Sequence, residues 1–564
     1  MNAIPHLRVP VGPDPERWRT FPGERTLVAV ARTLTSTVRI LDVLPSLLGS
    51  DPRVDVVFAY DPTSAFNDGV LDLLRSVDGG VRVMPWEQLP EIETHLFLTA
   101  TENADFTGTT ADVLVLPHGV GFHKQVPDAR GEGTRISGVP AGLLAEGRAW
   151  LAISHPAQEE QLRAAHPEIA GRTVLAGDPA LDRLHDSERM RAGYRRALGV
   201  RPDQRLVLVT STWRTESLIG RHPGLPARLL AELPYDDYRV AAVLHPNAWH
   251  GHGPAEVARL QADALPGGLL LIPPAAGWPA TLVAADLVIG DHGSVTFYGA
   301  ALGKPLLLGA FGEEAEPDTP MAELGSAVDT LDPSRALLPQ LEAAWLGHDP
   351  ERLAKITESA FADPGRTVEQ LRRKVYELLD LSVPPRRPRE LTCPEPVPVA
   401  APPVRSFLVS TTTVRELDGR WVVALRRAPA TAAGEETGPA GDWTRHLSCS
   451  DRERDTRLLA SASTVTVEEQ AHSTVAGRAR LAEVFEQWPY CRVAAVRTPH
   501  GFLTALWDGR VVEAALTGPR PDPVLPAAAV YAALLAGLPL ADTTVELQVG
   551  ERTFDVALRT LGQL

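Results

Sequence analysis

The feature that most constrains the fold is a repeated alternation of short Val/Leu/Ile-rich runs with segments of helical periodicity. One series of such runs lies between residues 26 and 154, and a second lies between residues 205 and 311. Apolar runs separated by helical segments are typical of βαβ units, whose parallel sheet is buried on both faces. Two series in tandem predict an α/β protein with two Rossmann-like lobes and a ligand cleft between them.

Chain length and local composition predict a division into further domains. Its 564 residues exceed what one hydrophobic core usually serves. The predicted parts are an N-terminal arm (1–25), a first Rossmann-like lobe (26–186), a second, nucleotide-binding Rossmann-like lobe (187–381), a Pro-rich linker (382–406) and a C-terminal domain (407–564). The proline content predicts an extended, semi-rigid linker, and a helical pattern over residues 349–381 is expected to close the second lobe.

The C-terminal domain is predicted to be α+β. Asp-Gly pairs at 418–419 and 508–509 separate β-rich runs, which is a strong hairpin signal, and residues 547–558 have a third hairpin pattern. Residues 473–488 have the pattern of a helix. The most apolar stretch, 525–541, is short and contains two prolines, so a buried helix explains it better than a membrane span.

Charge and cysteine content exclude several classes. The net charge of −16 argues against a nucleic-acid partner, whose phosphates need a basic face. Three widely spaced cysteines indicate reduced thiols rather than a disulfide framework. Without an apolar N-terminal core or a transmembrane segment, the chain is expected to be cytoplasmic, or peripheral to the membrane.

Polar residues that follow the strand-like runs are the candidate site, because ligands of such sheets bind beyond the carboxyl ends of the strands. His118 follows one run, and histidine, whose unperturbed pKa is about 6.5, can act as a general base; a structural hydrogen bond is the alternative. After another run lie Thr210, Ser211, Thr212 and Arg214, whose hydroxyls and guanidinium suit a phosphate. A solvated loop is the alternative there.

Two further positions complete the candidate site. His245 precedes a proline at a strand end, and His250 and His252 follow, but no carboxylate or cysteine completes a metal-ligand spacing, so no metal is expected. His245 is a candidate phosphate contact. Residues 284–311 predict a strand, a polar turn and a helix whose N-terminus is an anion site, unless the turn serves packing only. The phosphate-binding residues predicted there are Asp291, His292, Gly293, Ser294 and Thr296.

Taken in order, HG (118–119), GDPALDRL (177–184), TSTWR (210–214), LHP (244–246) and GDHGSVTFYGAALGKPLL (290–307) resemble the CDP-glycerol glycerophosphotransferase family. These enzymes build teichoic acid-type polymers on a GT-B scaffold of two Rossmann-like lobes. The resemblance covers about residues 26–380 and implies catalytic roles for His118 and His245. His292 and Gly293 replace a tyrosine and a serine of the family's Asp-Tyr-Ser-Ser stretch, and Tyr298 stands where the family often has an acid.

These observations predict a transferase that modifies a hydroxyl acceptor with a nucleotide-linked donor, such as CDP-glycerol or a related CDP-polyol, and no other cofactor. Ser294, Arg214 and His245 would hold the donor diphosphate, and His118 would deprotonate the acceptor. Two alternatives remain open. One is a nucleotide-sugar glycosyltransferase or epimerase, and the other is a non-catalytic nucleotide sensor whose C-terminal domain contacts a protein partner.

Overall fold

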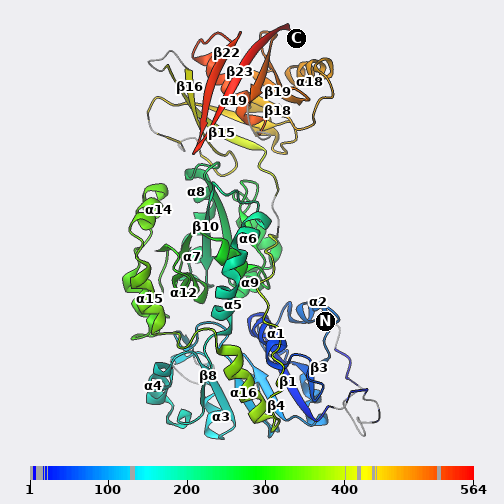
Figure 1. Cartoon of the computed structure of the whole chain (residues 1–564), viewed down its shortest axis with the longest axis vertical. Helices are drawn as coiled ribbons and strands as arrows, with labels where there is room; N and C mark the ends of the chain where they lie inside the picture. The colour runs from blue at the N-terminus through cyan, green and yellow to red at the C-terminus, as the bar shows by residue number, and fades with distance from the viewer. Residues whose placement is uncertain are drawn as a thin grey trace.

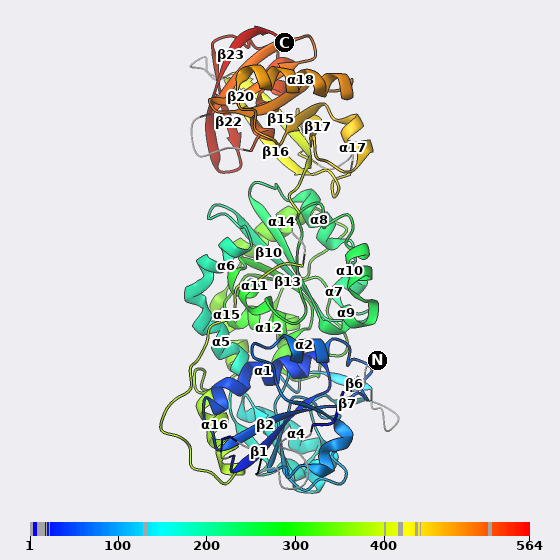
Figure 2. The same cartoon turned by 90° about the vertical axis from the view of Figure 1, so that its right-hand side faces the viewer.

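The computed structural model describes residues 4–7, 17, 20–21, 23–127, 134–399, 402–415, 421–434, 438–439, 441–516 and 522–564. Most of the predicted N-terminal arm, residues 1–25, therefore lies outside the described residues. The described chain forms three bodies stacked along the long axis, with the first lobe at one end, the second lobe in the middle and the C-terminal domain at the other end (Figures 1 and 2).

The first lobe is built on a parallel sheet of seven described strands. Their Val/Leu/Ile-rich segments are buried because helices cover both faces. In spatial order the strands are β3 (Val83–Pro85), β2 (Val54–Tyr60), β1 (Arg25–Ala31), β4 (Leu96–Thr99), β5 (Asp112–Val115), β8 (Ala149–Ile153) and β9 (Thr173–Leu175). Its helices are α1 (Leu34–Leu48), α2 (Val70–Ser76), α3 (Ala141–Ala145) and α4 (Pro156–Ala165). A short hairpin, β6 (Gln125–Pro127) and β7 (Thr134–Ile136), projects from it.

The second lobe repeats the plan with a parallel sheet of five described strands. In spatial order they are β12 (Leu270–Ile272), β11 (Tyr238–Leu244), β10 (Arg205–Ser211), β13 (Leu287–Gly290) and β14 (Leu306–Leu308). Its helices are α6 (Arg191–Ala197), α7 (Leu218–Arg221), α8 (Leu225–Glu232), α9 (Pro246–His252), α10 (Pro254–Leu260), α11 (Trp278–Ala284), α12 (Ser294–Ala301), α13 (Pro320–Ala327), α14 (Leu337–Leu346) and α15 (Pro350–Glu358). Two α/β lobes with parallel sheets are thus present, as predicted.

The chain crosses between the lobes twice. Helix α5 (Pro179–Ser187) follows β9 of the first lobe but packs into the core of the second through Leu181 and Leu184. Helix α16 (Thr367–Leu378) follows the second lobe but packs against α1 through Leu371 and Val375. The predicted helical pattern over 349–381 is therefore two helices on different lobes, because a break after α15 redirects the chain.

The C-terminal domain differs from the α+β prediction. Its strands close into a barrel in the order β15 (Ser406–Arg415), β16 (Trp421–Pro429), β22 (Thr543–Val549), β23 (Arg552–Gln563), β21 (Arg510–Leu516), β20 (Gly501–Leu506), β19 (Val493–Thr498), β18 (Thr464–Val467) and β17 (Thr444–Ser450). Parallel pairing of β16 with β22 and of β18 with both neighbours joins strands that no hairpin connects. Closure leaves no unpaired strand edge, which is the physical gain over an open sheet.

Several local predictions for this domain are confirmed. The Asp-Gly pair at 508–509 joins β20 to β21, and β22 and β23 form the third hairpin. The pair at 418–419 lies outside the described residues. The barrel's helices are α17 (Thr456–Ser461), α18 (Thr474–Gln487) and α19 (Val524–Leu535). The apolar stretch forms α19, which is buried in one cluster with the barrel strands. Within the described part of the chain, no helix has the length and apolarity to cross a bilayer.

The Pro-rich segment before the barrel has no helix or strand in its described residues, and it packs along both lobes (Figure 2). The Pro388 ring lies against Gly49 of the first lobe. Cys393 is buried in the second lobe, where its backbone N–H donates to Ser187 Oγ at 2.9 Å and its carbonyl accepts from Tyr194 at 2.6 Å. Val399 then donates its backbone N–H to Leu271 at the edge of the second sheet.

Candidate functional site

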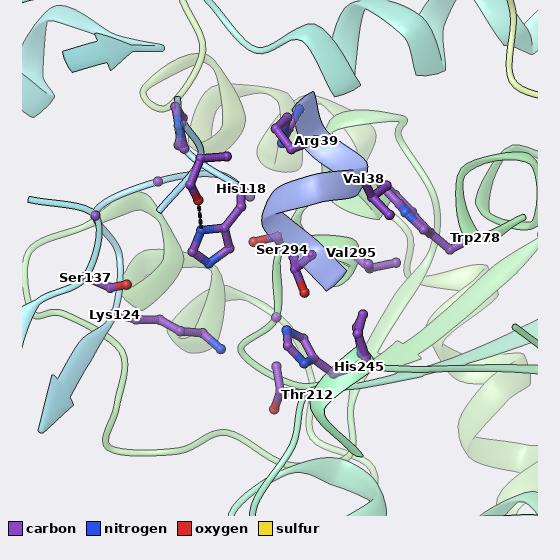
Figure 3. Close-up of a pocket in the computed structure, with 18 of the residues that line it drawn as sticks. Val38, Arg39, His118, Lys124, Ser137, Thr212, His245, Trp278, Ser294 and Val295 are labelled. Atoms are coloured by element: carbon purple, nitrogen blue, oxygen red, sulfur yellow. Dashed lines mark hydrogen bonds between the residues drawn. The ribbon is translucent and has the colours of Figure 1, made fainter. Parts of the chain in front are cut away.

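A cavity lies between the two lobes, at the carboxyl ends of both parallel sheets. From the first lobe it is lined by one face of α1 and by the loops after β4 and β5, and from the second by the loops after β10, β11 and β12 and the start of α12 (Figure 3). Seven of the predicted site residues line it: His118, His245, Thr210, Ser211, Thr212, Gly293 and Ser294. Two regions that are far apart in the sequence therefore meet at the carboxyl ends of the strands, where parallel α/β sheets bind their ligands.

His118 presents an unprotonated nitrogen to this cavity. Its Nδ1 lies 3.1 Å from the carbonyl oxygen of Ala100. Because a carbonyl oxygen only accepts, this hydrogen bond assigns the proton to Nδ1, and the neutral ring carries a lone pair on Nε2. The ring is open to the cavity and surrounded by protein elsewhere. This burial lowers the pKa of His118, while Glu102 acts in the opposite direction.

His245 presents the opposite tautomer. It caps the N-terminus of α9, and its Nδ1 accepts a hydrogen bond from the backbone N–H of Asn247 at 3.1 Å. The proton of the neutral ring is therefore on Nε2, which makes that nitrogen a donor. Burial, with nearby Lys124 and His118, lowers the pKa of His245 to about 3. The cavity thus has one histidine that accepts and one that donates.

Ser294 begins α12 without a side chain capping the helix, since Gly293 is the N-cap residue. The first backbone N–H groups of the helix are consequently available to an anion. The hydroxyl of Ser294 accepts the backbone N–H of Val120, from the first lobe, at 3.2 Å. Gly119 allows this approach, because a side chain at that position would collide with the Ser294 hydroxyl.

Lys124 is a cavity residue that sequence reasoning missed. Its ammonium extends into the cavity between His118 and His245 (Figure 3), and within the part of the chain that the structure describes it forms no ion pair. Burial lowers the pKa of Lys124, and the carboxylates of Asp291 and Glu314 oppose this. The available signal was its place in the same loop as His118, in a chain with four lysines.

Two predicted site residues lie behind the cavity lining and bond to neighbouring loops. Asp291 does not line the cavity, because its carboxylate accepts hydrogen bonds from the backbone N–H and the hydroxyl of Thr212, both at 2.8 Å, and from Leu218 N at 3.0 Å. It thereby ties the loop after β10 to the turn after β13. His292 is buried away from the cavity, and its Nδ1 accepts the backbone N–H of Gly312 at 3.1 Å.

Two other predicted phosphate contacts also lie outside the cavity lining. The guanidinium of Arg214 pairs with Glu314 at 2.9 Å and is absent from the cavity lining. Thr296 is fully buried and packs over Gly290 at the end of β13, two positions after Ser294 and therefore on another side of the helix. Helical geometry explains this, since successive residues point about 100° apart.

A buried polar network beside the cavity was also missed. Arg39, on α1, lies 3.6 Å from Asp178 and donates to the hydroxyl of Tyr298 at 3.3 Å. Tyr298 in turn donates to Asp178 at 2.7 Å, while Asp178 caps α5. Tyr298 follows Ser294 by one helical turn, and Arg39 lines the cavity. The network therefore joins α1 of the first lobe to the helix that carries the uncapped N-terminus.

Metal ligation finds no support in the geometry. Among the residues that the structure describes, no three His, Cys, Asp or Glu side chains are grouped so as to hold an ion. His250 and His252 lie on α9 and do not line the cavity, and His250 packs against Phe66. The polar groups that face the cavity are instead suited to hydrogen bonds with an anion and with a hydroxyl.

Comparison with protein-family models identifies a family that part of this chain resembles. Residues 141–315 match the family model of CDP-glycerol:poly(glycerophosphate) glycerophosphotransferases. The predicted family resemblance is confirmed. The matched segment includes His245 and Ser294, whereas His118 precedes it. The two-lobed part of this glycerophosphotransferase-like chain is accordingly a transferase of the glycerophosphotransferase or glycosyltransferase type, as predicted.

Solved structures resemble the chain at a distance. The wall teichoic acid polymerase TagF shares 13% identity, with 63% of this chain and 89% of that one covered and a TM-score of 0.44. Staphylococcus aureus MnaA with UDP shares 13%, covering 65% and 100%, with a TM-score of 0.40. A Listeria monocytogenes protein described as a UDP-N-acetylglucosamine 2-epimerase shares 14%, covering 64% and 99%, with a TM-score of 0.41. No curated protein sequence matches the chain.

Proposed function

We propose that the two lobes transfer a polyol phosphate group, such as glycerol phosphate, from a CDP-linked donor to a hydroxyl acceptor. The observation that carries this proposal is the pair of opposed histidine tautomers in one cavity. His118 offers a lone pair at Nε2, and His245 offers an N–H at the same atom. One suits removal of a proton from an acceptor, and the other suits a hydrogen bond to a phosphate oxygen.

The donor diphosphate would lie against the second lobe. The uncapped N–H groups at the start of α12, the Ser294 hydroxyl and His245 Nε2 are donors on that side. Lys124 adds an ammonium from the first lobe. Fixed donors of this kind stabilise charge that develops on a leaving group, because they need no reorganisation during the reaction. This arrangement requires the lobes to be in contact, as they are through the hydrogen bond from Val120 to Ser294.

In the proposed reaction the acceptor oxygen attacks the phosphorus that bears the polyol. The acceptor O–H bond breaks and its proton passes to His118 Nε2. A new O–P bond forms as the bond between that phosphorus and the departing CMP oxygen breaks. The negative charge that develops on CMP is stabilised by Lys124, by His245 and by the N–H groups at the start of α12. The atoms balance without a further reactant.

Release of CMP from CDP-glycerol, measured with glycerol phosphate-ended acceptors, tests the proposal. Wild-type turnover is expected to exceed that of a His245→Ala variant by 100-fold or more, the scale of a lost transition-state donor. The exposed His252→Ala variant is the matched control, on the same helix. Turnover of UDP-sugars in place of CDP-glycerol would instead support the glycosyltransferase alternative, and binding of nucleotide without any turnover would support a sensor.

A further inference from the structure

A second ionisable side chain is buried in the cavity wall beside His118. Glu102 follows β4, two residues after Ala100, whose carbonyl oxygen accepts the His118 hydrogen bond. Glu102 lines the same cavity, and only 6% of its side chain is exposed. A carboxylate buried to this extent stays charged only if specific partners stabilise the charge.

Arg135 donates a side-chain hydrogen bond that fixes this carboxylate in place. Its Nη2 lies 3.0 Å from Glu102 Oε1 and 2.9 Å from Asn103 Oδ1, so strand β7 is clamped to the loop after β4. Burial raises the pKa of Glu102, but His118, the backbone N–H groups of Glu102 and Gly138, and Arg135 together hold it below its ordinary value. Glu102 is therefore an anion at a fixed position.

The charges around His118 explain why an anion is needed there. Arg39 from α1 and Lys124 from the following loop are cations that oppose a positive charge on the ring, whereas Glu102 favours it. From the second lobe His245 faces the same space, as a neutral ring. The two cations suit a cavity that binds phosphate. Without a counter-charge they would also penalise the imidazolium that a general base becomes.

We propose that Glu102 is a positioning residue whose carboxylate stabilises the imidazolium formed when His118 takes the acceptor's proton. This inference rests on the proposed function of His118. Glu102 neither takes nor gives a proton: the Nδ1–H of His118 remains bonded to Ala100 O, and the new proton resides on Nε2. The ring is thus oriented by a carbonyl group and stabilised through space by a separate carboxylate, so the two tasks belong to different residues.

The test follows the His118 ring itself, by NMR of the full chain carrying carbon-13-labelled histidine. The His118 signal is identified by its loss in His118→Gln. In Glu102→Gln the pKa of His118 is expected to fall by about one unit, because loss of an adjacent charge commonly shifts a pKa by that much. In Glu102→Asp, which keeps the charge, the pKa should stay within about 0.3 units of the wild-type value.

Turnover gives the second measurement. In Glu102→Gln the acid limb of the CMP-release rate is expected to move to lower pH by the same amount, with kcat about tenfold lower and the donor KM unchanged. Glu87→Gln, an exposed carboxylate of the same lobe, is the matched control and should change neither quantity. If Glu102→Gln does not fold, Glu102→Ala removes the same charge without adding a buried amide.

The outcomes separate two failures. An unchanged His118 pKa in a folded variant that lacks the Glu102 charge would overturn this inference, whatever the turnover. Full activity of His118→Gln would overturn the proposed function and, with it, the role of Glu102 in the reaction. In that second case the NMR titration would still detect the electrostatic coupling, so the two results cannot be confused.

Discussion

The chain has two joints between neighbouring bodies, and they are built from different interactions. Between the lobes, the loop His123–Gln125 exchanges backbone hydrogen bonds with the loop Glu314–Glu316, at 2.9 Å and 2.8 Å. Between the second lobe and the barrel, Arg427 forms two hydrogen bonds with Asp236, at 2.8 and 3.1 Å, and both side chains are 3% exposed. The loop contact between the lobes is neutral and partly open to water, beside the buried network of Arg39, Asp178 and Tyr298 that also joins them. The barrel joint centres on a buried ion pair.

This difference indicates which joint can open. Backbone groups at a partly exposed contact exchange their protein partners for water at little net cost. Separation of a buried ion pair leaves two charges that must be solvated or paired again. The loop contact can therefore part at little cost, although opening of the lobes must also break the hydrogen bond from Arg39 to Tyr298. The barrel is suited to remain fixed to the second lobe. The barrel also sits at the strand starts of that lobe, away from the cavity (Figure 1).

The largest effect is expected at the cavity, on rate and not on stability. His118→Ala should lower turnover about 100- to 10,000-fold, the usual contribution of a general base, and leave donor affinity nearly unchanged. Calorimetric titration with CDP and the rate of CMP release measure the two quantities. A variant that loses donor affinity and rate together would show that His118 binds the donor instead.

At the barrel joint, a substitution is expected to change the stability of the chain and to leave the rate of turnover unchanged. Arg427→Leu should lower the free energy of unfolding by about 3 kcal/mol, because Asp236 loses a buried partner and, among the described side chains, keeps its ion pair with Arg552. Urea unfolding of the full chain measures this. Arg426→Leu, its exposed neighbour, is the matched control. A loss below about 1 kcal/mol would mean that the joint is not held by this charge pair.

Acid sensitivity should be shared between the lobes and the barrel. Burial lowers the pKa of His123, His245 and His446 to about 3. Since the unfolded chain binds these protons near pH 6.5, each histidine should lower the free energy of unfolding as pH falls from about 6.5 towards 3, by up to about 1.4 kcal/mol per pH unit. His446→Leu should remove one such contribution, and the exposed His472→Leu none.

The smallest effect is expected at Arg214. Because its guanidinium pairs with Glu314 and does not line the cavity, Arg214→Ala should change CDP affinity by less than about 1 kcal/mol, the range of an exposed ion pair. Calorimetric titration measures this. A loss of 1.5–3 kcal/mol, the scale of a hydrogen bond to a charged group, would show that Arg214 moves onto the diphosphate when the donor binds.

Much of the two-lobed fold could be predicted because it follows from local pattern. Apolar runs and helical periodicity identify the parallel strands, and the sheet rule then brings His118, His245 and Ser294 to one cavity. The pattern of apolar residues does not determine the direction in which a side chain points within the turn after a strand. Asp291 and Thr296 flank Ser294 in sequence, yet one is turned inward to backbone donors and the other packs over Gly290.

The remaining features depend on contacts between distant parts of the chain. Arg39 meets Tyr298 across 259 positions, and nothing in either local sequence identifies the partner. The barrel shows the same limit, because its hairpins are visible in the sequence while the parallel pairing of β16 with β22, which closes it, is not. Pairing of this kind is decided by which buried surfaces fit together.

The linker sets a limit on how far the lobes can part. Its chain is held to the first lobe at Pro388 and to the second at Cys393, so five Cα–Cα steps join the two anchor points. Fully extended, five steps span roughly 17 Å. The segment between these anchor points is thus a tether with a fixed maximum length between the two lobes. Any rotation that opens the cavity must stay within that reach or first pull Cys393 out of the second lobe.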